Sequence, residues 1–445
     1  MNDKTKLLGE EKMSKTLLVM GIPTMVGMLV SALYNLVDAY FVGKLGTLPM
    51  AAVSVVNPIS YVGMFVGLHF GCGGNSVIAR AFGKGDKDKV RKYSATATYA
   101  ALAVISILIF LLLIFINPVI HVLGGMPEYE EMAKSYATVF IIGLFFNVFN
   151  MCMNNMIVAE GNSFTSMAAM FAGAVVNIGL DPILILHLNM GVVGASVATL
   201  ISRMVSSAIY IAYILSKRSM LSINPLDYQF DRACIRDIVA VGIPVALFQL
   251  INGVGQTLIN NLARKYGADA QAALGIVSKV MFLELNLLYG FFKGYSPVVG
   301  YNYGAGNMNR VKGATRLALL WSSSATLLLG IVMIVFRNNI ITCFNQESVR
   351  VLEIGAFALV IYSISYLTYG GQIIIGNYFI AIGEARIGGL LSVGKGVIYI
   401  LYLILMEKMF GLTGIILAQI CADFTGTLVT VFAYINYHKK VVAIS

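Results

Sequence analysis

Several side chains that can bind a proton or a cation interrupt the apolar runs in the first half of the sequence. Asp38 follows Tyr34 by four residues, which places both side chains on one face of a helix. Two further pairs have the same spacing, Asn177 with Asp181 and Thr199 with Arg203. If these runs cross a membrane, each aspartate costs about 2.5–3.5 kcal/mol at the bilayer centre, so acids there usually serve a function or an ion pair.

The oxygen atoms of these side chains indicate one kind of chemistry. Burial favours the protonated form of a carboxyl group, and carboxylate, amide and hydroxyl oxygens are also ligands for hard cations. We therefore expect Asp38, Asn177, Asp181 and Thr199 to bind H⁺ or Na⁺, with no other metal and no organic cofactor. Asp181 has an alternative role, which is a structural ion pair with Arg203.

The second half of the sequence repeats the first, and we call residues at matching positions repeat counterparts. Gly21-Ile22-Pro23 aligns with Gly242-Ile243-Pro244. A proline inside a helix permits a kink, so Pro23 predicts a bending helix, with passive curvature as the alternative. The polar set is not repeated, because the repeat counterparts of Asp38, Asn177, Asp181 and Thr199 are Ile259, Tyr399, Leu403 and Gln419. We therefore expect the ion chemistry in the first half alone.

The second half carries a different set of polar residues within its apolar runs: Gln256, Glu284, Lys293, Lys395 and Asp423. Lys395 and Asp423 lie on consecutive predicted helices, which favours a structural ion pair. Glu284 and Lys293 are nine residues apart, so they lie on roughly opposite faces of one helix and cannot both face one cavity.

We expect Glu284 to be the member of that pair that faces a substrate cavity, together with Gln256 and Met281. Methionine adapts to ligands of varied shape, and aromatic rings attract organic cations. In that position Glu284 would attract cationic substrates. The alternative is that it pairs with a lysine such as Lys279 or Lys395.

The composition and the length of the apolar runs place the chain in a membrane. Of its 445 residues, 58% are hydrophobic and only 12% are charged, against about 25% charged residues in soluble domains. Runs of about 20 apolar residues cross the hydrocarbon layer as helices. We predict an all-α polytopic protein with twelve membrane spans, at roughly 16–43, 50–80, 94–116, 133–158, 165–187, 193–216, 237–264, 270–301, 314–336, 351–380, 387–407 and 413–437.

The predicted spans divide into two lobes of six helices. We assign 1–216 to an N-terminal lobe, 217–236 to a cytoplasmic linker and 237–445 to a C-terminal lobe. Six spans return the chain to the same side, so the lobes are related by a parallel two-fold repeat. With both termini in the cytoplasm, 20 lysines and arginines lie in inner segments and 7 in outer ones, as the positive-inside rule requires.

Other classes of protein fit the sequence poorly. The basic residues behind the net charge of +10 lie in loops between spans, so they do not indicate a nucleic-acid partner. Five scattered cysteines without a CxxC pair predict neither disulfides nor a zinc site. No HExxH or paired-histidine motif indicates an enzyme, and the two-lobed repeat disfavours a channel. We expect a monomer in the cell membrane, with the lipid bilayer and small organic compounds as its partners.

These residues resemble those of one known family. The run 31–43, SALYNLVDAYFVG, is similar to the first helix of the multidrug and toxic compound extrusion (MATE) transporters, and the glycine loops 81–85 and 300–306 resemble the family's duplicated loop. The resemblance covers the whole chain. It is closest to the branch with coupling acids in the N-lobe, the DNA-damage-inducible and archaeal-type members. It implies an ion site at Asp38, Asn177, Asp181 and Thr199, flanked by Tyr34, Tyr136 and Asn154, with Pro23 as the bending residue.

The resemblance also implies a function. It predicts a secondary active antiporter, not an enzyme, that exports organic and often cationic, amphipathic compounds from the cytoplasm. H⁺ or Na⁺ entering from outside would bind the N-lobe acids and favour release of the substrate. The alternative within the same superfamily is a lipid-linked oligosaccharide flippase, against which twelve spans and acids in the first lobe both count.

Overall fold

The computed structural model describes residues 3–216, 218–228, 232–344 and 348–444, and within these ranges the chain is helical without strands. The first half contains α1 (Asp3–Gly9), α2 (Met13–Gly43), α3 (Thr47–Val56), α4 (Ile59–Gly83), α5 (Lys87–Ile114), α6 (Ile116–Val122), α7 (Glu130–Ala159), α8 (Ser163–Asp181), η1 (Pro182–His187) and α9 (Gly191–Leu215). The second half contains η2 (Pro225–Asp227), α10 (Arg232–Arg264), α11 (Ala268–Gly304), α12 (Met308–Val335), α13 (Arg337–Phe344), α14 (Val349–Ile382) and α15 (Ala385–Ile444). The predicted all-α class is confirmed.

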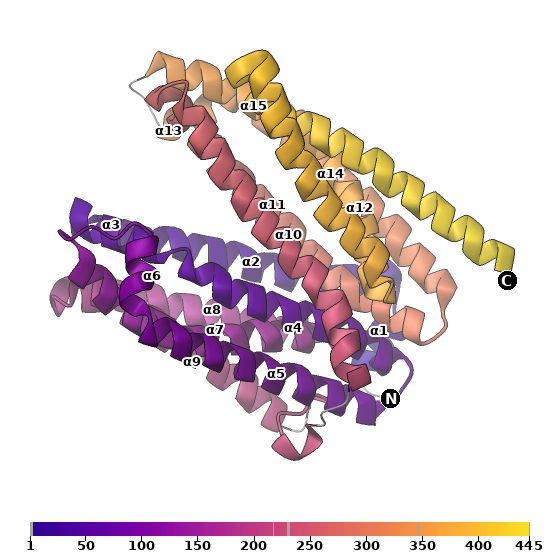
Figure 1. Ribbon diagram of the computed structural model, residues 1–445. Coiled ribbons are helices and arrows are strands. Elements are labelled where there is room, and N and C mark those ends of the chain that lie inside the picture. The colour runs from indigo at the N-terminus through magenta and orange to yellow at the C-terminus, as the bar shows by residue number, and fades with distance from the viewer. Residues whose placement is uncertain (1–2, 217, 229–231, 345–347, 445) are drawn as a thin grey trace.

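Eleven helical segments of the described chain are long and apolar enough to cross a membrane, and the last of them accounts for two spans. That segment, Ala385–Lys439, has 55 residues and is about 80 Å long if straight, more than twice the ~30 Å hydrocarbon layer. Gly411 interrupts it with φ 59° and ψ −134°. Figure 1 shows α15 turning back on itself, so twelve spans are formed as predicted.

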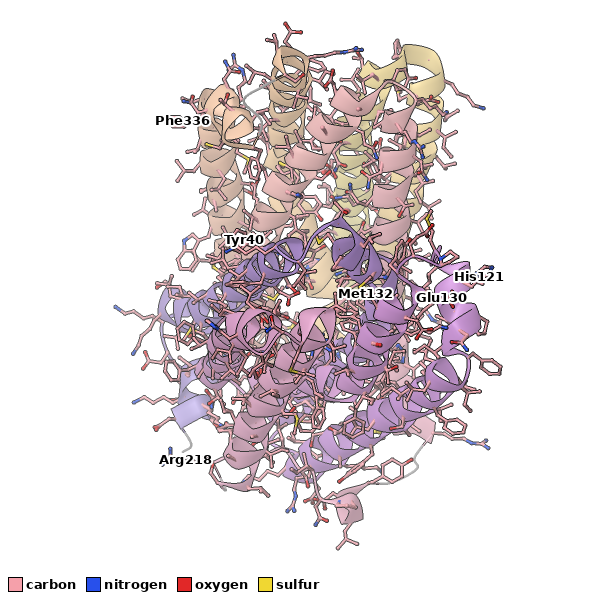
Figure 2. All side chains as sticks on the ribbon, turned by 90° about the vertical axis from the view of Figure 1, so that its left-hand side faces the viewer. Tyr40, His121, Glu130, Met132, Arg218 and Phe336 are labelled. Atoms are coloured by element: carbon pink, nitrogen blue, oxygen red, sulfur yellow. The ribbon has the colours of Figure 1, made fainter. Side chains whose placement is uncertain are left out.

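The helices form two lobes that meet at one end of the molecule. Helices α2–α9 make up the N-lobe and α10–α15 the C-lobe; α2 packs against α11, and α4 packs against both α10 and α11. The lobes diverge toward the end that carries α3, α6 and α13, and both termini lie at the opposite end (Figure 1). Figure 2 looks onto the diverging end, where Tyr40 and Met132 lie on the N-lobe below the C-lobe helices.

The assigned domain boundaries remain predictions. The predicted linker 217–236 includes residues 217 and 229–231, which lie outside the described residues. Its described part contains η2, where the Asn224 side chain accepts a hydrogen bond from Leu226 N at 3.0 Å. Arg91 of α5 forms an ion pair of 3.1 Å with Asp227 there, so this connection is fastened to the N-lobe.

The repeat of the sequence is also present in the backbone. Four pairs of repeat-related glycines adopt positive φ angles, a region that other residues rarely occupy. Each pair has nearly the same φ: Gly46 and Gly267 (112° and 102°), Gly85 and Gly306 (73° and 74°), Gly161 and Gly383 (90° and 91°), Gly191 and Gly411 (56° and 59°). The two lobes therefore share their turns, which confirms the parallel repeat.

Two predicted spans of the N-lobe are broken where the sequence analysis expected continuous helices. The span 50–80 consists of α3 and α4, which separate at Pro58, because proline has no N–H to donate to the helix. The span 165–187 changes from α8 to the π-helix η1 at Pro182, which has no N–H to donate. Both breaks follow from prolines in the N-lobe.

Glycines bring the two lobes into backbone contact at the end near the termini. A Cβ atom on Gly83 would collide with the carbonyl oxygen of Tyr301, and one on Gly304 would collide with the carbonyl oxygen of Arg80. Gly83 and Gly304 are repeat counterparts, as are Arg80 and Tyr301, so the contact is two-fold symmetric. This close approach of α4 and α11 closes one end of the space between the lobes.

Candidate functional site

The predicted ion-site residues come from helices that pack together in the N-lobe. Asp38 lies on α2, Asn177 and Asp181 end α8, and Thr199 lies on α9; α8 packs against both other helices. The carboxyl groups of Asp38 and Asp181 are close enough to interact electrostatically. Asn177 Nδ2 donates a hydrogen bond of 3.3 Å to Asp181 Oδ1. The structure thus brings the two acids and the amide together, with Thr199 half-buried on the neighbouring helix.

Three oxygen atoms of this cluster have no hydrogen-bond partner among the described residues: Asp38 Oδ1, Asn177 Oδ1 and Asp181 Oδ2. Buried polar atoms in proteins are normally paired, and each unsatisfied one costs about 1–3 kcal/mol. Three such oxygens in one place are chemically suited to receive a proton or a small cation.

Arg203 lies near this cluster but forms no ion pair within 4.0 Å with either acid in the described chain. Its guanidinium interacts electrostatically with Asp38 and lies 5.2 Å from the centre of the Phe140 ring. One of its nitrogens, Nη1, has no hydrogen-bond partner within the described chain. None of the ion pairs within 4.0 Å in the described ranges joins it to Asp181, so the alternative of a direct Asp181–Arg203 pair is absent from this conformation.

The neighbours expected from the resemblance lie on two sides of this cluster. Tyr136 of α7 is buried and interacts electrostatically with both acids. Tyr34 faces a cavity between the lobes, as does Asn154. The amide of Asn154 donates hydrogen bonds to Ser166 Oγ at 2.6 Å and to Tyr210 Oη at 2.9 Å.

This cavity has a volume of about 770 Å³, in the range of pockets that hold drug-sized ligands. Helices α4 and α11 contribute the same face to it. Five pairs of lining residues are repeat counterparts: Tyr61 and Phe282, Met64 and Leu285, Leu68 and Tyr289, Cys72 and Lys293, Asn75 and Ser296. The cavity therefore lies on the pseudo-two-fold axis between the lobes.

The cavity residues predicted for the C-lobe are only partly in the lining. Gln256 and Met281 line the cavity. Glu284 lies behind the lining with Tyr366 as an electrostatic neighbour, and it is 2% exposed. Its repeat counterpart Gly63 faces Leu144 inside the N-lobe, so this helix position turns toward its own lobe. The expectation that Glu284 faces the cavity therefore does not describe this conformation.

The ion pair expected in the C-lobe is formed. Lys395 Nζ lies 2.6 Å from Asp423 Oδ1 and 3.6 Å from the centre of the Tyr369 ring. Gln419 Nε2 donates a hydrogen bond of 2.7 Å to Asp423 Oδ2, and Ser365 also contacts this carboxylate. Glu284 pairs with neither Lys279 nor Lys395 within 4.0 Å in the described chain, and both of its carboxyl oxygens lack partners there.

Sequence reasoning identified Lys293 as a membrane-depth charge but assigned it no role. The structure places it in the cavity lining beside Cys72, its repeat counterpart. The signal was available in the sequence, because positions 282, 285, 289 and 293 follow one another at intervals of three, four and four residues, which places Lys293 on one helix face with three apolar residues.

Comparison with known proteins identifies the fold. The family model MatE matches residues 23–183 and again 244–405, once in each lobe. The chain belongs to the MatE family. It is similar to the multidrug export protein MepA of Staphylococcus haemolyticus, with 27% identity over 433 residues, 97% of this chain and 95% of that protein.

Solved structures of MatE-type transporters share the whole fold. An outward-facing multidrug resistance MATE transporter superposes with a TM-score of 0.91 and 26% identity, covering 97% of each chain. A MOP-superfamily transporter from Pyrococcus furiosus, whose binding pocket is described as having reverse polarity that suggests a different function, superposes with a TM-score of 0.88 and 25% identity. It covers 96% of this chain and 97% of its own.

Membership of the MatE family establishes the general class of the protein. The chain is a multi-pass membrane transporter of the multidrug-export kind and not an enzyme, as the resemblance implied. The two-lobed architecture of twelve spans is confirmed in the same way. The assignment to the branch with N-lobe coupling acids stays a prediction.

Proposed function

We propose that this protein exports small organic compounds from the cytoplasm in exchange for H⁺ or Na⁺. The coupling ion binds in the N-lobe at Asp38, Asn177 and Asp181, with Thr199 beside them. The substrate binds in the cavity between the lobes. Both termini face the cytoplasm, so the end at which the lobes diverge faces outward.

One observation carries this proposal more than any other. The three unpartnered oxygens of Asp38, Asn177 and Asp181 are buried in a lobe whose repeat counterpart has no acid at these positions. A transporter gains nothing in stability from unsatisfied buried carboxyl oxygens. An ion that binds there in one step of a cycle gives them a purpose, and protonation or Na⁺ binding changes the charge next to Arg203.

The alternative of a lipid-linked oligosaccharide flippase receives no support from the relatives, which are multidrug export proteins. The expected preference for cationic substrates stays a prediction. The Pyrococcus furiosus transporter is described as having a binding pocket of reverse polarity. The charge of the pocket in this protein therefore has to be judged from its own residues.

Transport in proteoliposomes tests the proposal. The purified protein is reconstituted, and a pH gradient and a Na⁺ gradient are imposed independently on vesicles loaded with a panel of dyes that includes fluorescein and rhodamine 123. We expect one of the gradients to drive dye movement that stops when the gradient is collapsed. Movement driven by neither gradient, for every dye in the panel, would contradict the proposed antiport.

A further inference from the structure

Lys293 is a charged residue at membrane depth whose role the ion site does not explain. It lies on α11 in the middle of the chain's central cavity and is half-buried. No ion-pair partner lies within 4.0 Å of its ammonium group among the described residues. Unpaired charges at this depth are costly and mark transport pathways by default.

The contrast with Lys395 shows what Lys293 lacks. Lys395 also borders the cavity, but Asp423 neutralises it at 2.6 Å and Gln372 Oε1 accepts a hydrogen bond from it at 2.7 Å. The buried lysine with a structural role in this protein is thus one that is paired with a carboxylate. Lys293 differs from it, because its electrostatic neighbour is the thiol of Cys72 rather than a carboxylate.

The repeat places this ammonium group at the centre of the molecule. Cys72 and Lys293 are repeat counterparts, and they are close enough to interact. Residues that meet their own counterparts lie near the pseudo-two-fold axis. The next pair on this face, Asn75 and Ser296, is joined by a hydrogen bond of 3.4 Å. A ligand at Lys293 is thus within reach of both lobes.

The charged side chains that line the central cavity also indicate which kind of ligand it binds. Among the described residues that line the cavity, the charged ones are Arg203, Lys293 and Lys395, and none is a carboxylate. The acids of the surrounding helices, Asp38, Asp181, Glu284 and Asp423, lie behind the lining. The remaining surface is rich in tyrosine, methionine and asparagine, including Met64, Met281, Tyr289 and Tyr366.

We propose that the cavity binds an organic anion, a compound whose carboxylate, sulfonate or phosphate group contacts the Lys293 ammonium. Its apolar or aromatic body packs against the tyrosine and methionine side chains. The hydroxyl of Ser296, one turn after Lys293 and held only by its 3.4 Å bond, can turn to donate to the same anion. This inference rests on the proposed transport function and reverses the expected preference for cations.

Two dyes with the same xanthene core and opposite charge test the inference. Fluorescein is anionic at neutral pH and rhodamine 123 is cationic. Their equilibrium binding to the full-length protein in nanodiscs is measured by fluorescence polarisation, without any gradient, against empty nanodiscs. We expect fluorescein to bind at least about tenfold more tightly than rhodamine 123, the size of one charge-assisted contact. Tighter binding of rhodamine 123, or equal binding, would overturn the inference without any variant.

Variants assign the effect to one residue. Lys293→Met should weaken fluorescein binding about tenfold and leave rhodamine 123 unchanged or tighter, while Lys293→Arg should retain the preference. Lys279→Met is the matched control, since Lys279 lies on the same helix and is exposed. Unchanged fluorescein affinity in a folded Lys293→Met protein would refute the role of Lys293. Because binding is measured without gradients, failure of the antiport proposal would leave this result readable, and the reverse also holds.

Discussion

The two lobes share their turns but arrange their buried acids differently. In the C-lobe, Asp423 is held by Lys395, Gln419 and Ser365, so its charge is neutralised within the lobe. In the N-lobe, Asp38 and Asp181 keep one unpartnered oxygen each among the described residues, although Arg203 is nearby. Arg203 and Asp423 are repeat counterparts of opposite sign. The N-lobe thus gathers two acids with unpartnered oxygens around one amide, whereas the C-lobe has one acid in an ion pair and a single acid, Glu284, whose oxygens lack partners among the described residues.

The largest effect is expected for Asp38→Asn. The substitution removes a carboxyl group that the repeat does not duplicate, so gradient-driven dye transport should fall to the level of empty liposomes. The folded protein should persist, because the new amide can donate to neighbouring unsatisfied oxygens. Dye flux and the thermal midpoint in detergent are both measured. Wild-type flux in this variant would remove Asp38 from the coupling site.

A large effect on stability, rather than on coupling, is expected for Asp423→Asn. It leaves Lys395 buried without its counter-charge, and breaking a buried pair from one side costs about 3–5 kcal/mol. Thermal unfolding in detergent should show a clearly lower midpoint. The double variant Lys395→Met with Asp423→Leu should recover most of the loss. If Asp423→Asn melts like the wild type, the pair is not structural.

Placing an acid in the C-lobe at the counterpart of Asp38 is not expected to create a working coupling site there. Ile259→Asp restores an acid at the counterpart of Asp38, but Ile259 is 4% exposed and Tyr399 and Leu403 provide no amide or carboxylate partner. We expect a loss of stability of a few kcal/mol and no rescue of transport in the Asp38→Asn background. Robust rescue in the proteoliposome assay would show that the lobes are interchangeable.

The smallest effect is expected for Glu284→Gln. Glu284 lies behind the cavity lining and Met281 lies in it. The affinities of fluorescein and rhodamine 123 should therefore each change less than about threefold, which corresponds to about 0.7 kcal/mol. Met281→Ala is the positive control and should weaken both dyes alike. A selective loss of rhodamine 123 binding in Glu284→Gln would place this carboxylate in the substrate site after all.

Much of the fold could be predicted because the repeat and the apolar runs can be recognised from the sequence itself. The glycine loops 81–85 and 300–306, noted in the sequence for their resemblance to the family's duplicated loop, contain turns with matching φ angles at Gly85 and Gly306. The π-helix after Asp181 was not predicted. It lies where the N-lobe is longer than the C-lobe, since the segment from Gly161 to Gly191 contains two more residues than the segment from Gly383 to Gly411. Pro182 marks the break in the α-helix, but a proline does not distinguish a π-helix from an ordinary helix end.

The candidate sites could be predicted only in part. Spacing of four residues predicted that Asn177 and Asp181 share one helix face, and in the structure a hydrogen bond joins them. Spacing also showed that Glu284 and Lys293 face opposite ways, but it did not say which of them faces the cavity. That choice depends on how α11 is rotated against α4 and α14, which is a property of packing between distant helices. A single sequence likewise does not give the depth of a residue in the membrane or the distance between residues on different helices.

The central claim is that the N-lobe acids bind the coupling ion, and infrared difference spectroscopy of the reconstituted protein tests it most directly. Spectra are recorded on exchange between acidic and neutral buffer, and between Na⁺-free and Na⁺-containing buffer. We predict carboxyl bands that respond to one of these exchanges in the wild type, disappear in the double variant Asp38→Asn with Asp181→Asn, and persist in Glu284→Gln. Bands that are the same in the wild type and in the double variant on both exchanges would contradict the account.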